Sequence, residues 1–368
     1  MRNSRFIALV IVSIASSFLS LTLKAQKDVM LTQHWVMPTL LNPAATGDID
    51  FIRIRGGARL DYLGLHASPK NFLGTVDAPF KVMGKRVGAG VMVNSESYDL
   101  YRNLHIGAQG SYKFNIKKSR LSIGLQIGYY HSKFKGSEYI LSKPDDETGD
   151  DTPGDVTPDE GIQTFADSDL NPDYDIDPDP EPGYGGGAYG DDDMPTQDVK
   201  AGTFDISIGI RYEHPFFYVG LAGLHLTNPT LKLTTEGEST TDSRYLEYKM
   251  PMSLYFDAGG NIPIPNSLFT LQPSVQVATD FSDFNSVIEM RATYNQRVTF
   301  GVDYRWNRAV GVMAGISIKN FFLGYSWEYD YTEAAKKSTG NHELILGYQF
   351  KLDMGGKNQF SHRSIRIM

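Results

Sequence analysis

The stretch Leu121-Ser122-Ile123-Gly124-Leu125-Gln126-Ile127-Gly128-Tyr129 decides the fold class of this protein. Its odd positions are large and apolar, and its even positions are small or polar. Successive side chains of a strand point to opposite faces of a sheet, so this pattern predicts one apolar and one small or polar face. The alternation recurs from about residue 50 to residue 352, in segments of about ten residues. Such segments match tilted transmembrane strands and predict an all-β, antiparallel transmembrane β-barrel.

The polar face of several predicted strands carries charge. These inward-facing residues are Asp205, Arg211, Asp303, Arg305, Glu328 and Asp330. They either line a conducting pore or form a salt-bridged plug, and a barrel of fourteen strands needs water or filler inside. The sequence leaves both alternatives open.

The periodicity predicts about fourteen strands. They span 50–60, 69–79, 86–94, 102–115, 120–133, 203–213, 216–226, 247–260, 268–280, 285–295, 297–307, 309–319, 321–331 and 342–352. With the first strand running outward, the inner turns are all short, whereas the outer connections include the two longest, 134–202 and 227–246. Outer-membrane barrels have short periplasmic turns and long external loops, so this layout predicts an outer-membrane location with both termini periplasmic. Aromatic residues near strand ends, such as Trp306 and Trp327, predict an interfacial girdle.

The remaining segments flank this barrel. Arg2 and Arg5 precede an apolar run that ends near Ala25, which predicts a signal peptide over residues 1–25. Residues 26–49 are then a periplasmic N-terminal lead-in, 50–352 the barrel, and 353–368 a periplasmic C-terminal tail. The chain contains no cysteine, which excludes disulfides, thiolate metal sites and a lipidated cysteine.

Residues 144–198 form one long acidic external loop. They contain 19 acidic residues and neither Lys nor Arg, which is typical of a disordered segment. Subtracting them from the net charge of −8 leaves +11, and removing Arg2, Arg5 and Lys24 with the signal leaves +8. The barrel body is therefore basic.

Two patterns raise the question of a metal site. Asp167, Asp169, Asn171, Asp173 and Asp175 place oxygen ligands at every second residue, as a calcium loop does. Prolines stand where that loop needs glycine and glutamate, so we favour a solvated acidic tract; calcium is the one cofactor considered, and none is expected elsewhere.

The pair His342-Glu343 lacks the second histidine of a zinc motif, because Gly347 stands in its place. We interpret this pair as hydrogen-bonding residues at the barrel seam. No nucleophile elbow and no phosphate-binding glycine loop occurs, so the sequence predicts no enzyme.

Three stretches resemble the PorP/SprF family of type IX secretion proteins. They are Gln33 to Gly47, Arg59 to Pro69, and Asn341 to Tyr348, and they occur in the family's order and spacing over nearly the whole mature chain. Tyr62 replaces the family's usual Trp, and Ala67-Ser68 replace Gly-Ala. The motif residues carried over as structural are Gln33, Pro38, Asn42, Pro43, Arg59, Gly64, Pro69, His342, Glu343 and Gly347. Asn42-Pro43-Ala44 is either a partner-binding element or a rigid lead-in or lumen plug, and the restricted proline backbone favours the second.

The resemblance implies a non-enzymatic outer-membrane barrel of the type IX secretion and gliding machinery. Such a protein helps export a secreted cargo or adhesin, or holds its C-terminal domain at the cell surface. Its implied partners are outer-membrane lipid, that cargo and a periplasmic peptidoglycan-associated or secretion-system protein, with no nucleic acid. The alternatives are a channel or transporter for small solutes, or a barrel phospholipase, for which no external Ser/His pair is found.

Overall fold

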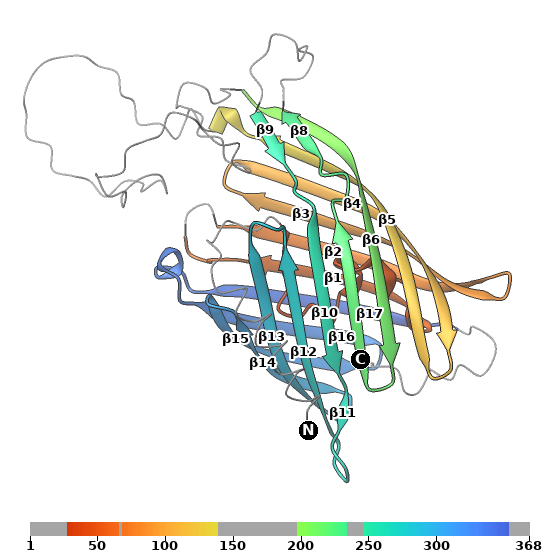
Figure 1. The fold of residues 1–368 in the computed structure, drawn as a ribbon. Helices are drawn as coiled ribbons and strands as arrows, with labels where there is room; N and C mark the ends of the chain where they lie inside the picture. Colours follow the sequence, from red (N-terminus) through yellow and green to blue (C-terminus); the bar gives the residue numbers. More distant parts are fainter. Residues whose placement is uncertain (1–27, 66–67, 139–196, 234–245, 353–368) are drawn as a thin grey trace, which may run out of the picture.

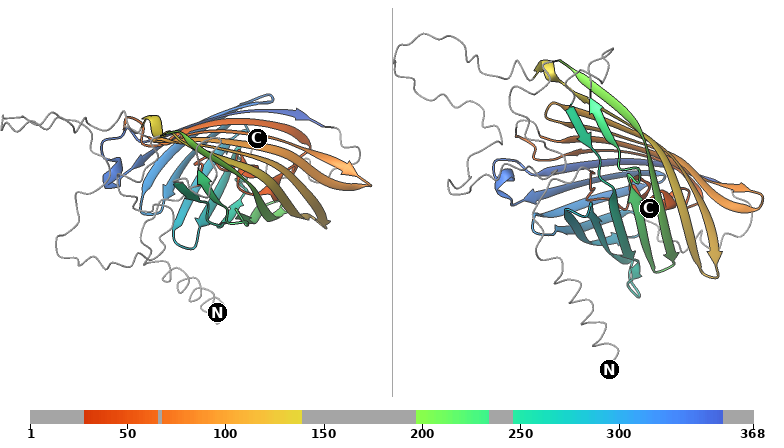
Figure 2. Two further views of the ribbon diagram at one scale, coloured as in Figure 1. Left: turned by 90° about the horizontal axis from the view of Figure 1, so that it is seen from above. Right: turned by 45° about the horizontal axis from the view of Figure 1, so that its top comes forward.

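The computed structural model of the protein describes residues 28–65, 68–138, 197–233 and 246–352. Fourteen strands form its wall: β1 (Phe51–Leu60), β2 (Lys70–Val82), β3 (Lys85–Tyr98), β4 (Tyr101–Ile116), β5 (Ser119–Phe134), β6 (Val199–His214), β7 (Phe217–Leu224), β10 (Ser253–Gly260), β12 (Phe269–Thr279), β13 (Phe284–Tyr294), β14 (Val298–Arg305), β15 (Ala309–Ile318), β16 (Phe321–Asp330) and β17 (Asn341–Lys351). Every neighbouring pair is antiparallel, and the first strand pairs with the last from Phe51↔Lys351 to Leu60↔His342. β10 joins β7 on one side and β12 on the other, so the sheet closes into a barrel (Figures 1 and 2). The predicted all-β barrel of fourteen strands is confirmed.

Three short strands are additional to the fourteen strands of the wall. β8 (Thr230–Leu233) and β9 (Leu246–Lys249) pair with each other as a separate two-stranded sheet, and β11 (Ile262–Pro263) extends a turn. The predicted strand 247–260 is therefore wrong as a single element. Pro251 lies in the break between β9 and β10, where a residue without a backbone N–H cannot donate to a strand ladder.

The predicted alternation is confirmed in the exposure of the side chains. Along β16, Phe321, Leu323, Tyr325, Trp327 and Tyr329 are exposed on the outer face, whereas the intervening residues are buried. An outer-membrane barrel presents such an apolar face to lipid. Tyr304 and Trp306 lie outward at the end of β14, as Trp327 and Tyr329 do near the end of β16, which agrees with the predicted girdle.

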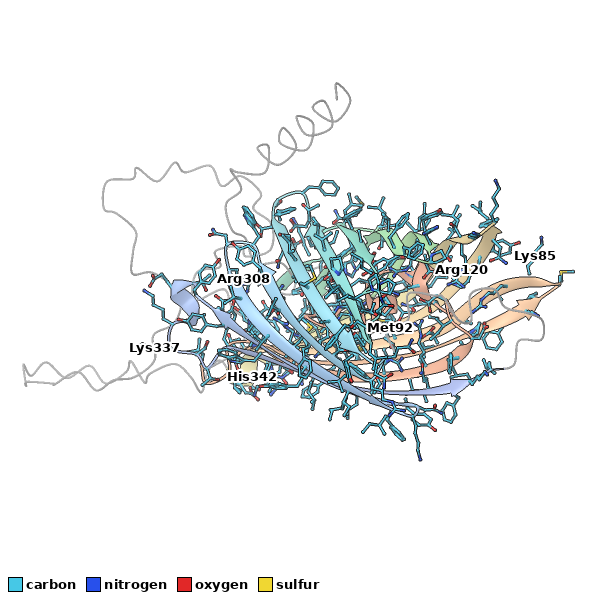
Figure 3. All side chains as sticks on the ribbon, turned by 90° about the horizontal axis from the view of Figure 1, so that it is seen from below. Lys85, Met92, Arg120, Arg308, Lys337 and His342 are labelled. Atoms are coloured by element: carbon cyan, nitrogen blue, oxygen red, sulfur yellow. The ribbon has the colours of Figure 1, made fainter. Side chains whose placement is uncertain are left out.

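The barrel has two different ends. At the short-turn end, tight connections such as Met83–Gly84 join the strands; at the long-loop end lie the connections that include 135–198 and 225–252. Figure 3 shows Lys85 and Arg120 at the first end and Arg308, Lys337 and His342 at the other. β4, β5 and β6 have 16 residues each but β7 has 8, and β6 pairs with β7 only from Ile208 onward. One side of the wall is therefore taller toward the long-loop end.

Residues 28–49, here called the plug, lie inside the barrel. Two short 3-10 helices, η1 (Pro38–Leu40) and η2 (Pro43–Ala45), shape the plug, and nearly all of its side chains are buried. Leu31, Trp35 and Met37 pack with wall residues such as Phe322 and Ile345 in one apolar cluster. The segment predicted as a periplasmic lead-in thus reaches β1 from within the lumen, because its apolar side chains find partners there and not in water.

Several predictions fall outside the described residues. They are the signal peptide 1–25, the tail 353–368 and the acidic loop 144–198 apart from Gln197 and Asp198, with the calcium candidates Asp167, Asp169, Asn171, Asp173 and Asp175. Where the chain is described, no helix is long and apolar enough to cross a membrane.

The outward face can be tested by placing a charge in the middle of β17. Leu346 lies at its centre and is 56% exposed, so Leu346→Arg places a guanidinium in lipid and should lower the free energy of unfolding by roughly 2–4 kcal/mol. Denaturant unfolding in lipid vesicles measures the change. Met83, 97% exposed in a short turn, supplies the control Met83→Arg, which should leave stability nearly unchanged. Equal losses in the two variants would contradict the membrane-facing assignment.

Candidate functional site

Residues at the seam between β1 and β17 bind the part of the plug that lies nearer the long-loop end. Register places Arg59 opposite Glu343, and both point into the lumen. The backbone N–H groups of Thr32 and Gln33 donate to the two carboxylate oxygens of Glu343, each at 2.8 Å. Arg59 Nη1 donates to Glu343 Oε2 at 3.3 Å and to Thr32 Oγ1 at 3.0 Å. A buried backbone N–H needs a partner, so the closing pair of the barrel also anchors the plug.

Glu328 on β16 extends this network. Its Oε2 accepts from Arg59 Nη2 at 2.5 Å, and its Oε1 accepts from Arg305 Nη2 at 3.0 Å. Arg305 Nη2 also donates to the carbonyl of Met30 at 3.3 Å. Pairing offsets the cost of burying these charges, and the pairs that Glu328 makes join β16 to β1 and β14.

The Asn42-Pro43-Ala44 turn lies in a recess of the wall where β5 and β6 carry glycine, which has no side chain. Asn42 caps η2, since its Oδ1 accepts from the Ala44 N–H at 3.0 Å. A Cβ built on Gly124 would lie 2.2 Å from Ala44 N, and one on Gly209 would lie 2.1 Å from Asn42 Oδ1. Only glycine permits so close an approach of the turn to β5 and β6.

Side chains of β1 to β4 bind the part of the plug that lies nearer the short-turn end. Arg53 Nη2 forms ion pairs with Asp48 at 2.8 Å and Asp77 at 2.6 Å, and the Gly47 N–H donates to Asp77 Oδ2 at 2.7 Å. Ser111 Oγ donates to the carbonyl of Thr46 at 2.7 Å. The plug is therefore bonded to the wall along its whole length.

The remaining residues of the three family-like stretches lie at different positions in the barrel and the plug. Pro38 begins η1, and the carbonyl of Pro69 accepts from the Asp61 N–H at 3.0 Å. Gly64 has a φ of +99°, in the left-handed region that favours glycine, and Gly347 leaves room for Arg55. His342 and Glu343 both lie at the β1–β17 seam and form hydrogen bonds, but not with each other. Adjacent strand residues face opposite ways, so His342 Nδ1 lies 2.7 Å from the outward Tyr325 hydroxyl, while Glu343 faces the plug.

Most of the inward charged residues take part in a salt-bridged interior. Arg305 pairs with Glu328, Arg211 with Asp257 at 2.5 Å, and Asp330 with Arg308 at 3.2 Å. Asp205 Oδ2 lies 2.9 Å from His225 Nδ1, and the other ring nitrogen of His225 lies 3.0 Å from Asp28 Oδ1. Asp303 is buried, and neither of its carboxylate oxygens makes a hydrogen bond within the described part of the chain. Of the two alternatives for these charges, the structure shows the filled, ion-paired lumen.

Within the ranges the structure describes, no three His, Asp or Glu side chains are arranged to hold a metal ion. What the interior can do is close the lumen and fix the plug to the wall.

The family model described as "Type IX secretion system membrane protein PorP/SprF" matches residues 23–176 and 185–348. The chain belongs to this family. Its family and closed barrel together make it a Gram-negative outer-membrane protein of type IX secretion, whose partners include membrane lipid and other components of that system.

Solved structures of other barrels resemble this PorP/SprF protein at low identity. The P. putida toluene transporter TodX is 11% identical, with a TM-score of 0.42. The aligned region covers 86% of this chain and 93% of the TodX chain. The CymD monoaromatic hydrocarbon channel is 10% identical with a TM-score of 0.43, with coverages of 90% and 96%. Omp33 of Acinetobacter baumannii is 9% identical with a TM-score of 0.36, with coverages of 82% and 98%. No curated protein matches the sequence.

Sequence reasoning missed two parts of the PorP/SprF interior. The alternation identifies the glycines beside the plug only as small residues of a polar face, although Gly124 and Gly209 at inward positions signal that something fills the space opposite them. The cluster of Asp28, Asp205 and His225 left no local signal, since its members lie on three separate elements.

Filling the recess should dislodge the plug. Gly124→Ala would place a methyl group against Pro43 and Ala44, whereas Gly110→Ala on β4 meets no atom within 4 Å. In planar bilayers, we expect the wild-type protein and Gly110→Ala to stay closed and Gly124→Ala to conduct ions. Amide hydrogen exchange of residues 42–47 should rise in Gly124→Ala alone. Stable open channels in the wild-type protein would contradict a closed lumen and favour solute transport.

Removing the anchor charge should weaken the fold. Glu343→Ala leaves Arg59 short of one carboxylate and two plug N–H groups without acceptors, which should cost roughly 2–4 kcal/mol of unfolding free energy. Exposed Glu333, which pairs with Lys336, supplies the control Glu333→Ala, and we expect little change there. Denaturant unfolding followed by tryptophan fluorescence measures both. Equal stability of the two variants would show that Glu343 does not hold the plug.

Proposed function

We propose that this PorP/SprF protein is a non-enzymatic component of the type IX secretion and gliding machinery that helps export a secreted cargo protein or anchors it at the cell surface. The observation that carries the proposal is the bonded plug. A lumen filled from Met30 to Asp48 serves a closed scaffold better than a conduit for small solutes. With the lumen filled, partners would bind at the surfaces of the two ends of the barrel.

The long-loop end is the proposed cargo-binding surface. Here β4, β5 and β6 rise above β7, and the β8–β9 hairpin packs on the inner side of this taller wall through Leu231 and Leu233 (Figure 1). At the base of the long insertion, Lys133 Nζ pairs with Asp198 Oδ2 at 2.7 Å, and Ser137 Oγ donates to Asp198 Oδ1 at 2.8 Å. These contacts support a built platform for the C-terminal domain of a secreted protein or adhesin.

The short-turn end is the proposed periplasmic side, where a peptidoglycan-associated or secretion-system partner would bind. Short turns face the periplasm in outer-membrane barrels, which supports this orientation. Leu352, after β17, lies at this end, which supports a periplasmic C-terminal tail. Asp28 lies instead beside His225 toward the long-loop end, which does not favour a periplasmic start for the mature chain.

Site-specific photo-cross-linking in living cells tests the two surfaces. A benzoylphenylalanine at exposed Tyr98, the last residue of β3, should capture a secreted protein, and one at Met83 should capture a periplasmic envelope protein. The control position Leu346 faces lipid and should capture neither. Mass spectrometry of the products identifies the partners. Failure to capture any secreted or envelope protein at both positions would contradict the proposal.

A further inference from the structure

The exposed charges at the short-turn end are all positive in the part of the chain that the structure describes. Besides Lys81, six exposed cations lie in the short turns or directly beside them. These six, here called the basic rim, are Lys85, Lys117, Lys118, Arg297, Lys319 and Lys351. None of the six pairs with a carboxylate among the described residues. Figure 3 shows Lys85 at the tip of this end of the barrel. No role described above uses these side chains.

The carboxylates near the short turns are engaged by interior arginines. The pairs are Asp48–Arg53, Asp50–Arg86 and Glu213–Arg120, in which each arginine side chain is at most 12% exposed. The exposed carboxylates of the described chain, Asp99, Glu138 and Glu333, all lie at the long-loop end. The described surface of the short-turn end therefore carries one sign of charge and attracts anions.

Three cations of the basic rim directly follow an apolar side chain that faces outward. The pairs are Ile116–Lys117, Ile318–Lys319 and Phe350–Lys351. The apolar members are 49%, 58% and 46% exposed and lie on the outer face of β4, β15 and β17. A lysine in this position keeps its aliphatic stem beside hydrocarbon while its ammonium group reaches the headgroup layer. At the long-loop end, exposed Tyr98 and Trp306 are followed instead by Asp99 and Asn307.

The turns themselves do not require lysine. Lys117 has a φ of +52° and Lys319 a φ of +56°, in the left-handed region where glycine, asparagine and aspartate are the favoured residues. The turns at the long-loop end follow this preference, with Asp99 at a φ of +48° and Asn307 at +50°. Lysine stands at positions that local backbone chemistry disfavours, which indicates a use for its charge outside the turn.

We propose that the basic rim binds the phosphate groups of anionic phospholipids in the membrane leaflet at the short-turn end. Ammonium and guanidinium groups beside a membrane surface attract anionic headgroups, and the neighbouring apolar side chains hold the acyl chains. An acidic protein fits less well, because the cations are spread over the β2–β3, β4–β5, β13–β14 and β15–β16 turns and the end of β17 and are not gathered in one patch. The assignment to the periplasmic leaflet rests on the orientation proposed above, whereas the lipid preference does not.

Native mass spectrometry of the protein released from lipid nanodiscs tests this surface. The nanodiscs contain equal amounts of phosphatidylglycerol and phosphatidylcholine with the same acyl chains, and the bound lipids of each kind are counted. We expect phosphatidylglycerol to be preferred at least about fivefold, the effect of a single lysine near an anionic surface. The rim variant, Lys117→Asn with Lys118→Gln and Lys319→Asn, should reduce the preference to within about twofold. The matched control, which removes three exposed lysines at the long-loop end, is Lys70→Gln with Lys336→Gln and Lys337→Gln, and it should keep the preference.

The outcomes separate the possibilities. Asparagine suits a positive φ, so the rim variant should fold as the wild-type protein does, which circular dichroism checks. Equal binding of the two lipids by the wild-type protein, an unaltered preference in the rim variant, or equal losses in the rim variant and the control would overturn the proposal. If there is no lipid preference but the rim variant loses the cross-link from Met83 to an envelope protein, the rim binds protein, and the lipid proposal fails while the proposed function stands. A lipid preference that depends on the rim, without any cross-linked partner, would have the reverse meaning.

Discussion

Fourteen strands enclose a lumen that their own side chains cannot fill, and the rest of this structure depends on that constraint. In lipid the strand ladder must close, because an open edge would leave backbone groups without partners. Closure at this strand number leaves space inside, and the chain fills it with its own residues 28–49. The plug therefore follows from the size of the barrel as much as from its own sequence.

The plug is held by the same residues that close the barrel. Arg59 and Glu343 face each other across the β1–β17 seam, and Glu343 also accepts the N–H groups of Thr32 and Gln33. A segment without regular secondary structure carries many backbone groups that need partners once buried. Wall side chains supply these partners, which explains why the interior of the barrel is rich in buried Arg, Asp and Glu.

The filled lumen shifts the functional surfaces to the two ends of the molecule. The taller wall of β4, β5 and β6, with the β8–β9 hairpin packed against it, makes the long-loop end asymmetric. The connection 135–198 leaves β5 and enters β6 at this end.

The sequence by itself determined the strands, because the two-residue alternation is local: Leu121 to Tyr129 shows its two faces without reference to any other segment. The strand number and the segregation of short turns from long loops followed in the same way, and so did the inward direction of Asp205 and Glu328. Prediction from the sequence failed where a segment's structure depends on residues that are distant along the chain. The predicted strand 247–260 is broken at Pro251, and β9 pairs with β8 outside the barrel wall. Only the tertiary structure decided that residues 28–49 fill the lumen and that Asp28, Asp205 and His225 meet, because closure and register bring together residues that no local pattern connects.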